Sequence, residues 1–159
     1  MRPLANPSIA VLLLTASLLF LFPPPAEGQV DFGVRGGVFG SDAFLGAELL
    51  FPLQSSWYLN PNVEWVFVDN GDLFSLNGDI HYDFETGGNF DAWAGGGLAL
   101  LFRDFDRGRF RDDDNETDAG INLLGGLGFQ PGAQIRPYVQ GKITLSEDTE
   151  AAVAVGVRF

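Results

Sequence analysis

The single histidine of the chain lies among carboxylates at alternating positions. Asp79, His81 and Asp83 are two residues apart, and Glu64 lies on the preceding predicted segment. Residues two apart share one face of a β-strand, so this group could ligate a metal ion or exchange protons. A lone histidine in polar surroundings is more often part of a hydrogen-bond network, and no nucleophile stands out beside it. We therefore expect a polar network with no metal, no cofactor and no catalytic role.

A second charged group occupies the predicted loop 103–118. Basic residues lead this loop and an acidic run follows, in the order Arg107, Arg109, Arg111, Asp112, Asp113 and Asp114. Its functional interpretation is a contact surface, or a weak calcium or magnesium site built from the oxygens of residues 112–116. The run lacks the Asp-x-Asp-x-Asp-Gly frame of a strong calcium loop. A solvated loop that pairs its own charges is the favoured interpretation.

Composition excludes several classes of function. The formal net charge is −12, which argues against a nucleic-acid partner, because such a partner needs clustered lysine and arginine. The chain has no cysteine, so neither disulfides nor a thiolate metal site are available. Glycine (21 residues) and phenylalanine (15 residues) favour strands and tight turns over helices.

The first residues have the features of an export signal. Arg2 precedes an apolar run at 9–22, three prolines follow it, and Ala26-Glu27-Gly28 offers small residues for signal peptidase. The run is shorter than the about 20 residues that a membrane-spanning helix needs. The sequence predicts a signal peptide at 1–28, cleaved after Gly28, and one mature domain at 29–159.

The mature part alternates between apolar and polar or small residues. In the last segment Val153, Val155, Val157 and Phe159 alternate with Ala154, Gly156 and Arg158. This period of two is typical of strands with one apolar face. The same pattern predicts eight strands, at 30–39, 43–51, 57–68, 73–84, 90–102, 119–129, 135–145 and 151–159.

Short connections join these strands and carry turn residues such as Gly40-Ser41-Asp42 and Pro131-Gly132. Short connections favour antiparallel neighbours, and eight strands can close without a free edge. We therefore predict an all-β fold, an eight-stranded antiparallel up-and-down β-barrel.

Two properties decide which face of the barrel points outward. The apolar face carries too many large side chains for an eight-stranded interior, whereas the other face is rich in glycine, alanine and asparagine. The charges on the polar face nearly balance, as a closed interior requires. We predict a polar lumen network of Asp31, Arg35, Glu48, Glu64, Asp79, His81, Asp83, Arg136, Lys142 and Arg158. The ion pair expected first is Arg158 with Asp31, across the strands that close the barrel.

Aromatic residues near the strand ends predict two bands on the outer wall, as membrane barrels have at their interfaces. The band near the termini comprises Phe51, Trp57, Phe84, Phe90, Phe129 and Phe159. The band at the opposite ends comprises Phe39, Phe44, Phe67, Phe74 and Phe102.

With these features, residues 29–159 resemble the small outer-membrane β-barrels of the OmpA/OmpX type. The resemblance rests on the export signal, the alternating strands, the glycine-rich segments 94–98 and 124–128, and the last strand with its terminal aromatic residue. It implies that Val153, Val155, Val157 and Phe159 form the assembly signal that the barrel-insertion machinery reads. It also implies periplasmic termini and external loops near 40–42, 69–72, 103–118 and 146–149.

The resulting expectation is a monomeric transmembrane barrel in the outer membrane, with membrane lipid and the assembly machinery as partners. A charge-filled, plugged lumen favours a structural or surface-contact role without catalysis. Two alternatives stay open. One is a narrow passage for small or apolar solutes, as the resemblance to OmpW-like barrels suggests, and the other is a membrane-embedded lipid-modifying enzyme using His81.

Overall fold

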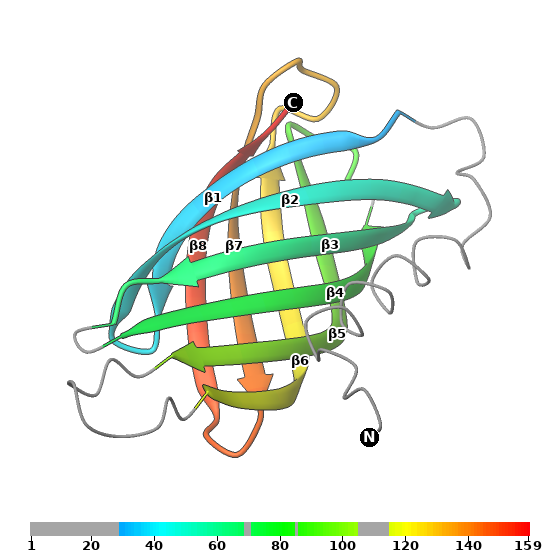
Figure 1. The fold of residues 1–159 in the computed structure, drawn as a ribbon. Helices are drawn as coiled ribbons and strands as arrows, with labels where there is room; N and C mark the ends of the chain where they lie inside the picture. Colours follow the sequence, from blue (N-terminus) through cyan, green and yellow to red (C-terminus); the bar gives the residue numbers. More distant parts are fainter. Residues whose placement is uncertain (1–28, 69–70, 85, 105–114) are drawn as a thin grey trace, which may run out of the picture.

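The computed structural model describes residues 29–68, 71–84, 86–104 and 115–159. Eight antiparallel strands, each paired with its neighbours in sequence, close into a barrel through β1 and β8 (Figure 1). The strands are β1 (Asp31–Phe39), β2 (Asp42–Gln54), β3 (Trp57–Val66), β4 (Asp72–Phe84), β5 (Phe90–Asp104), β6 (Asn115–Phe129), β7 (Arg136–Leu145) and β8 (Glu150–Arg158). Among these residues, no helix is long and apolar enough to span a bilayer.

All eight predicted strands are confirmed, and most of their ends differ by three residues or fewer. The exception is β6, which begins at Asn115 rather than near residue 119. Thr117 pairs with Phe102 and Glu116 with Arg103, so the β5–β6 hairpin extends into the predicted loop. Cross-strand pairing continues here although the residues are polar, so periodicity of hydrophobicity could not mark the strand end. The signal peptide at 1–28 and the loop residues Arg107, Arg109, Arg111, Asp112, Asp113 and Asp114 lie outside the described residues.

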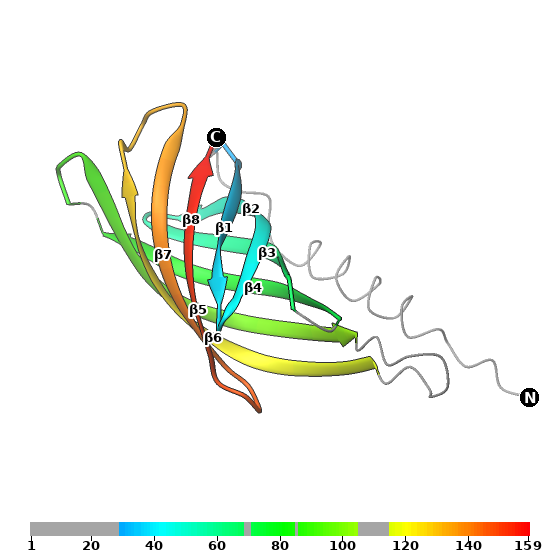
Figure 2. The same cartoon turned by 90° about the vertical axis from the view of Figure 1, so that its left-hand side faces the viewer.

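The two ends of the barrel differ in which connections they carry. The terminal end holds the start of β1, the end of β8 and the β2–β3, β4–β5 and β6–β7 connections (Figure 2). The far end holds the other four connections. There, β1 and β2 are joined by Gly40 and Ser41 alone, and Gly40 adopts a left-handed φ of 60° that glycine accepts without strain.

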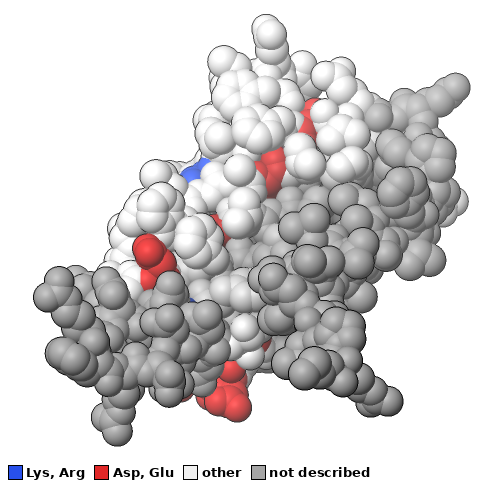
Figure 3. All heavy atoms as spheres, viewed as in Figure 1, with Lys and Arg blue, Asp and Glu red and all other residues white. Residues whose placement is uncertain are grey.

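The wall separates apolar from charged side chains by strand parity. Large apolar residues face outward on every strand, with Leu98 69%, Val155 64% and Leu45 61% exposed. Among the strand residues whose side chains are described, the charged ones have the parity of the lumen side, apart from Asp72 at the far end of β4. In the view of Figure 3, charged atoms form only small separate patches on a mostly uncharged face. The predicted orientation of the two faces is therefore correct.

The outer aromatic bands are confirmed at the terminal end and only in part at the far end. Trp57, Phe84, Phe90, Phe129 and Phe159 are exposed near the termini, as are Phe67 and Phe74 at the far end. Phe39 and Phe44, predicted for the far band, are instead buried in the lumen. The prediction was wrong because the strands there are apolar on both faces, so alternation no longer separates the inside from the outside.

Candidate functional site: the polar lumen

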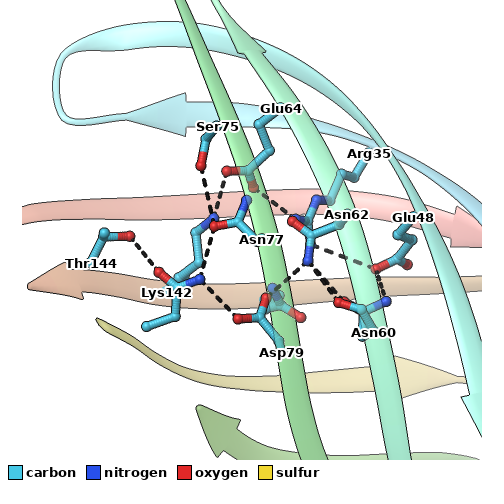
Figure 4. A network of polar contacts seen from close by, with 12 residues as sticks. Arg35, Glu48, Asn60, Asn62, Glu64, Ser75, Asn77, Asp79, Lys142 and Thr144 are labelled. Carbon is cyan, nitrogen blue, oxygen red and sulfur yellow. Dashed lines mark hydrogen bonds and ion pairs between the residues drawn. The ribbon is translucent and has the colours of Figure 1, made fainter. Parts of the chain in front are cut away.

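The centre of the lumen holds a continuous chain of five buried charges. Arg158 Nε donates to Glu48 Oε1 at 2.8 Å, and Arg35 Nη1 lies 3.6 Å from Glu48 Oε2. Arg35 Nη2 lies 2.8 Å from Glu64 Oε1, and Lys142 Nζ donates to Glu64 Oε2 at 2.5 Å. The order Arg158–Glu48–Arg35–Glu64–Lys142 alternates in sign and takes its residues from β8, β2, β1, β3 and β7 in turn. Figure 4 shows the part of this chain from Glu48 to Lys142.

Amide side chains surround this chain of charges and join it to a sixth charge, Asp79. The Asp79 carboxylate accepts hydrogen bonds from Asn62 Nδ2 at 2.9 Å and from Asn122 Nδ2 at 2.8 Å. Asn62 Oδ1 in turn accepts a hydrogen bond from Arg35 Nη2. Thr144 Oγ1 donates to Asn122 Oδ1 at 2.8 Å, so the contacts reach from β1 to β7 (Figure 4).

This network is neutral as a whole. Its three cations are Arg35, Lys142 and Arg158, and its three anions are Glu48, Glu64 and Asp79, all of them buried. Isolated buried charges are costly, and pairing with further hydrogen bonds offsets that cost. A lumen filled in this way is a rigid polar core.

The lumen glycines make room for the large polar and aromatic side chains opposite them. A Cβ at Gly126 would lie 2.3 Å from the Trp93 ring, and a Cβ at Gly33 would lie 2.7 Å from Glu48 Oε1. At Gly97 a Cβ would meet Asp79 Oδ1 at 2.3 Å. Because real Cβ atoms do not approach so closely, a larger residue at these positions would force its neighbours to shift.

Toward the terminal end, aromatic rings replace the amides. The Arg158 guanidinium carbon lies 4.7 Å from the centre of the Trp93 ring and 4.5 Å from that of Tyr138, within cation–π range. Trp93 Nε1 donates to Gln140 Oε1 at 3.2 Å. Arg158 thus ends the chain of charges inside an aromatic layer.

His81 belongs to this aromatic layer. Its ring centre lies 5.7 Å from that of Tyr58 and 5.9 Å from that of Trp93. Its Nε2 lies 3.1 Å from Asp83 Oδ1.

The structure does not gather into one site the four residues considered for metal or acid–base chemistry, namely Glu64, Asp79, His81 and Asp83. Asp79 and Glu64 accept hydrogen bonds from other lumen residues, and His81 contacts only Asp83 of that group. Within the described part of the chain, no three His, Cys, Asp or Glu residues are placed to hold a metal ion. No serine or threonine hydroxyl described here is hydrogen-bonded to His81.

At the far end, apolar side chains from six strands pack together inside the barrel. This far cluster consists of Phe39, Phe44, Val66, Leu73, Leu101, Ala152 and Ala154. Such a cluster offers no hydrogen-bond partner to water or to an ion. It lies between the chain of charges and the far mouth of the barrel.

The predicted ion pair between Arg158 and Asp31 is wrong. Arg158 bonds Glu48, and the Asp31 carboxylate lies 2.5 Å from Arg136 Nη2. The closing register places Arg158 opposite Gly33 and Arg136, two residues farther into the barrel than Asp31, and there its side chain bonds Glu48. The stagger of a closed barrel sets this register, and the sequences of the two strands do not reveal it.

Of the predicted lumen residues, Arg35, Glu48, Glu64, Asp79, Lys142 and Arg158 meet in one network. Arg136 and Asp31 form a separate, partly exposed pair near the terminal mouth, and His81 with Asp83 forms another. The predicted network was restricted to ionisable residues, so it left out neutral partners that the structure buries beside them, namely Asn60, Asn62, Asn77, Asn122, Gln140 and Thr144. Their inward parity was the signal that could have found them.

Two hollows of the described residues lie on the barrel wall. One of about 740 Å³ is lined mainly by outward-facing residues of β1, β7 and β8, among them Val34, Val139 and Val155. A second, of about 460 Å³, lies over Gly125 and Gly141. Both are shallow and apolar.

The residues of the predicted assembly signal occupy the outer face of β8. Val153 and Val155 are exposed, and Phe159 follows the strand at the terminal mouth. The Phe159 amide donates to the Phe32 carbonyl at 2.8 Å, and the two rings stack at 6.4 Å. The last residues therefore also complete the closure of the barrel onto β1.

Comparison with solved structures finds this fold in small outer-membrane barrels. The N-terminal β-barrel domain of Pseudomonas aeruginosa OprF has a TM-score of 0.67 and 19% identity, covering 82% of this chain and 95% of that one. Neisserial surface protein A has 0.64 and 14%, covering 81% and 94%. Ail, the attachment invasion locus protein of Yersinia pestis, has 0.58 and 11%, covering 82% and 96%.

No protein-family model matches the sequence, and no curated protein matches it either. The likeness therefore concerns the fold, and it covers 81–82% of this chain and 94–96% of each neighbour. The chain has the fold of the small eight-stranded outer-membrane β-barrels.

Proposed function

We propose that the chain is an exported outer-membrane barrel with a closed lumen and a structural or surface-contact role. The observation that carries this proposal is the separation of side chains by parity, with Leu98 and Val155 exposed on the wall and Arg35 and Glu64 buried within. Such a wall is unfavourable in water and suits the hydrocarbon core of a bilayer. The terminal end would face the periplasm and the far end the outside.

Two layers of the lumen support closure to ions and solutes. The charged groups of the central network bond one another, and the far cluster adds an apolar seal that includes Phe44 and Leu101. A passing ion would have to break buried pairs and then cross a layer with no polar partner. This arrangement favours a plugged barrel over a passage for small solutes.

The remaining parts of the proposal concern export, assembly and chemistry. Residues 1–28 direct export, and the outward residues Val153, Val155 and Phe159 are available to the insertion machinery before the barrel closes. The barrel works as a monomer in contact with membrane lipid. His81 takes no part in catalysis, since its contacts are two aromatic rings and Asp83.

Fractionation and electrophoresis test the membrane part of the proposal. The full chain should appear in the outer-membrane fraction, resist SDS until boiled and then change its mobility. A mature chain that is freely soluble in the periplasm would contradict it.

A planar-bilayer recording tests closure separately. The barrel inserted into a bilayer should show no current above that of protein-free lipid. Steady conductance from a correctly folded, heat-modifiable sample would support the narrow passage instead.

A further inference from the structure

The ladder between β2 and β3 is interrupted in the middle of the wall. Glu48 pairs with Asn62 and Phe51 with Leu59, but the ladder skips Leu49 and Leu50 on β2 and Asn60 and Pro61 on β3. We call these four residues the β2–β3 seam. The pairing on the other side of β3, between β3 and β4, continues through Asn60 and Pro61 without a gap.

Pro61 explains the interruption. Positions of the same parity along an extended segment direct their amides toward the same neighbour. The amide of Phe67, which directly follows β3, donates to the Ala43 carbonyl on β2. An amide at position 61 would therefore donate to the Leu49 carbonyl. Proline has no amide hydrogen, so this ladder bond is absent.

A side chain replaces the missing donor. Asn60 Nδ2 donates to the Leu49 carbonyl at 2.9 Å, and Asn60 itself is only 1% exposed. The same nitrogen donates to Glu48 Oε2 at 3.0 Å. One amide group therefore both closes the wall and joins the wall to the chain of charges.

We infer that the β2–β3 seam is the point where the barrel wall opens first, and that Asn60 is the positioning residue that holds it shut. At this position the wall lacks one backbone donor, and the Asn60 side chain supplies it. Because Asn60 is bonded to Glu48, the seam is coupled to the central ion pairs. This inference goes beyond the proposed function and does not depend on it.

Hydrogen exchange of the full chain folded in detergent micelles tests the inference. Asn60→Ala should raise exchange roughly tenfold in peptides covering 47–52 and 57–62, because the Leu49 carbonyl loses its donor. Peptides from β5 and β6 should change little. Asn122→Ala is the matched control, since the Asn122 amide donates to the side chains of Asn77 and Asp79 and not to the wall.

A double substitution isolates the role of proline. Pro61→Ala supplies a backbone amide at the seam, so it should slow exchange there. Asn60→Ala combined with Pro61→Ala should then behave like Pro61→Ala alone, because the Leu49 carbonyl has a new donor.

Two outcomes would overturn the inference. One is an Asn60→Ala effect of the same size with and without Pro61, and the other is equal exchange from all strands in the Asn60→Ala and Asn122→Ala chains. If Asn60→Ala does not fold, Pro61→Ala still decides: unchanged or faster exchange at the seam would refute a proline-weakened wall.

Discussion

The centre and the far end of the same lumen are filled by opposite means. The centre is held by alternating charges, with Glu64 between Arg35 and Lys142. The far cluster is held by close packing of side chains such as Phe44 and Leu101. A charged layer depends on complete pairing, whereas an apolar layer depends on filled volume. The two layers should therefore fail differently when one residue is changed.

The largest effect is expected where one change unpairs two charges. Glu64→Gln leaves Arg35 and Lys142 without their shared carboxylate, and we expect the free energy of unfolding to fall by about 3–5 kcal/mol. Urea unfolding in lipid vesicles, followed by tryptophan fluorescence, measures this change. Glu147→Gln, in the exposed β7–β8 connection, is the control and should change stability by less than about 0.5 kcal/mol. Equal losses from both would contradict a buried network.

The far cluster should lose stability through an unfilled volume. Phe44→Ala is expected to lower the free energy of unfolding by about 3 kcal/mol in the same assay. Phe74→Ala, on the outer wall and 43% exposed, should cost about 1 kcal/mol, mainly through its stacking on Trp65. A larger loss of stability for Phe74→Ala than for Phe44→Ala would contradict the assignment of Phe44 to the lumen and Phe74 to the outer wall.

A smaller effect is expected where the lumen has no spare volume. Gly126→Ala would bring a methyl group to 2.3 Å from the Trp93 ring, so overpacking should cost about 2 kcal/mol. Gly141→Ala is the control on the neighbouring strand, because no atom lies within 4 Å of its Cβ position. The midpoint temperature of the gel shift on heating, compared between the two variants, measures this difference. Equal midpoints for the two variants would contradict close packing between Gly126 and the Trp93 ring.

The smallest effect, none at all, is expected for chemistry at His81. Neither the parent chain nor His81→Ala should release acyl groups from lipid vesicles above the protein-free rate. Activity that the parent shows and His81→Ala lacks would restore the lipid-modifying enzyme as the function.

The sequence predicts most of the wall and only part of the lumen. Alternation located all eight strands and the correct outer face, because each strand has one lipid-like and one polar parity. It failed for Phe39 and Phe44, where both parities are apolar. It also could not pair Arg158 with Glu48 in place of Asp31, because the stagger that closes the barrel is a property of all eight strands together.

Lys142 is the one lysine in the entire sequence, and its side chain lies inside the barrel against Glu64. An amine-directed label therefore finds no lysine on the surface of the folded chain, and only the chain's own α-amino group stays available to it. Modification of this side chain would report each opening of the barrel in time, with no engineered probe. The rate at which Lys142 is modified would therefore measure how often the folded barrel opens.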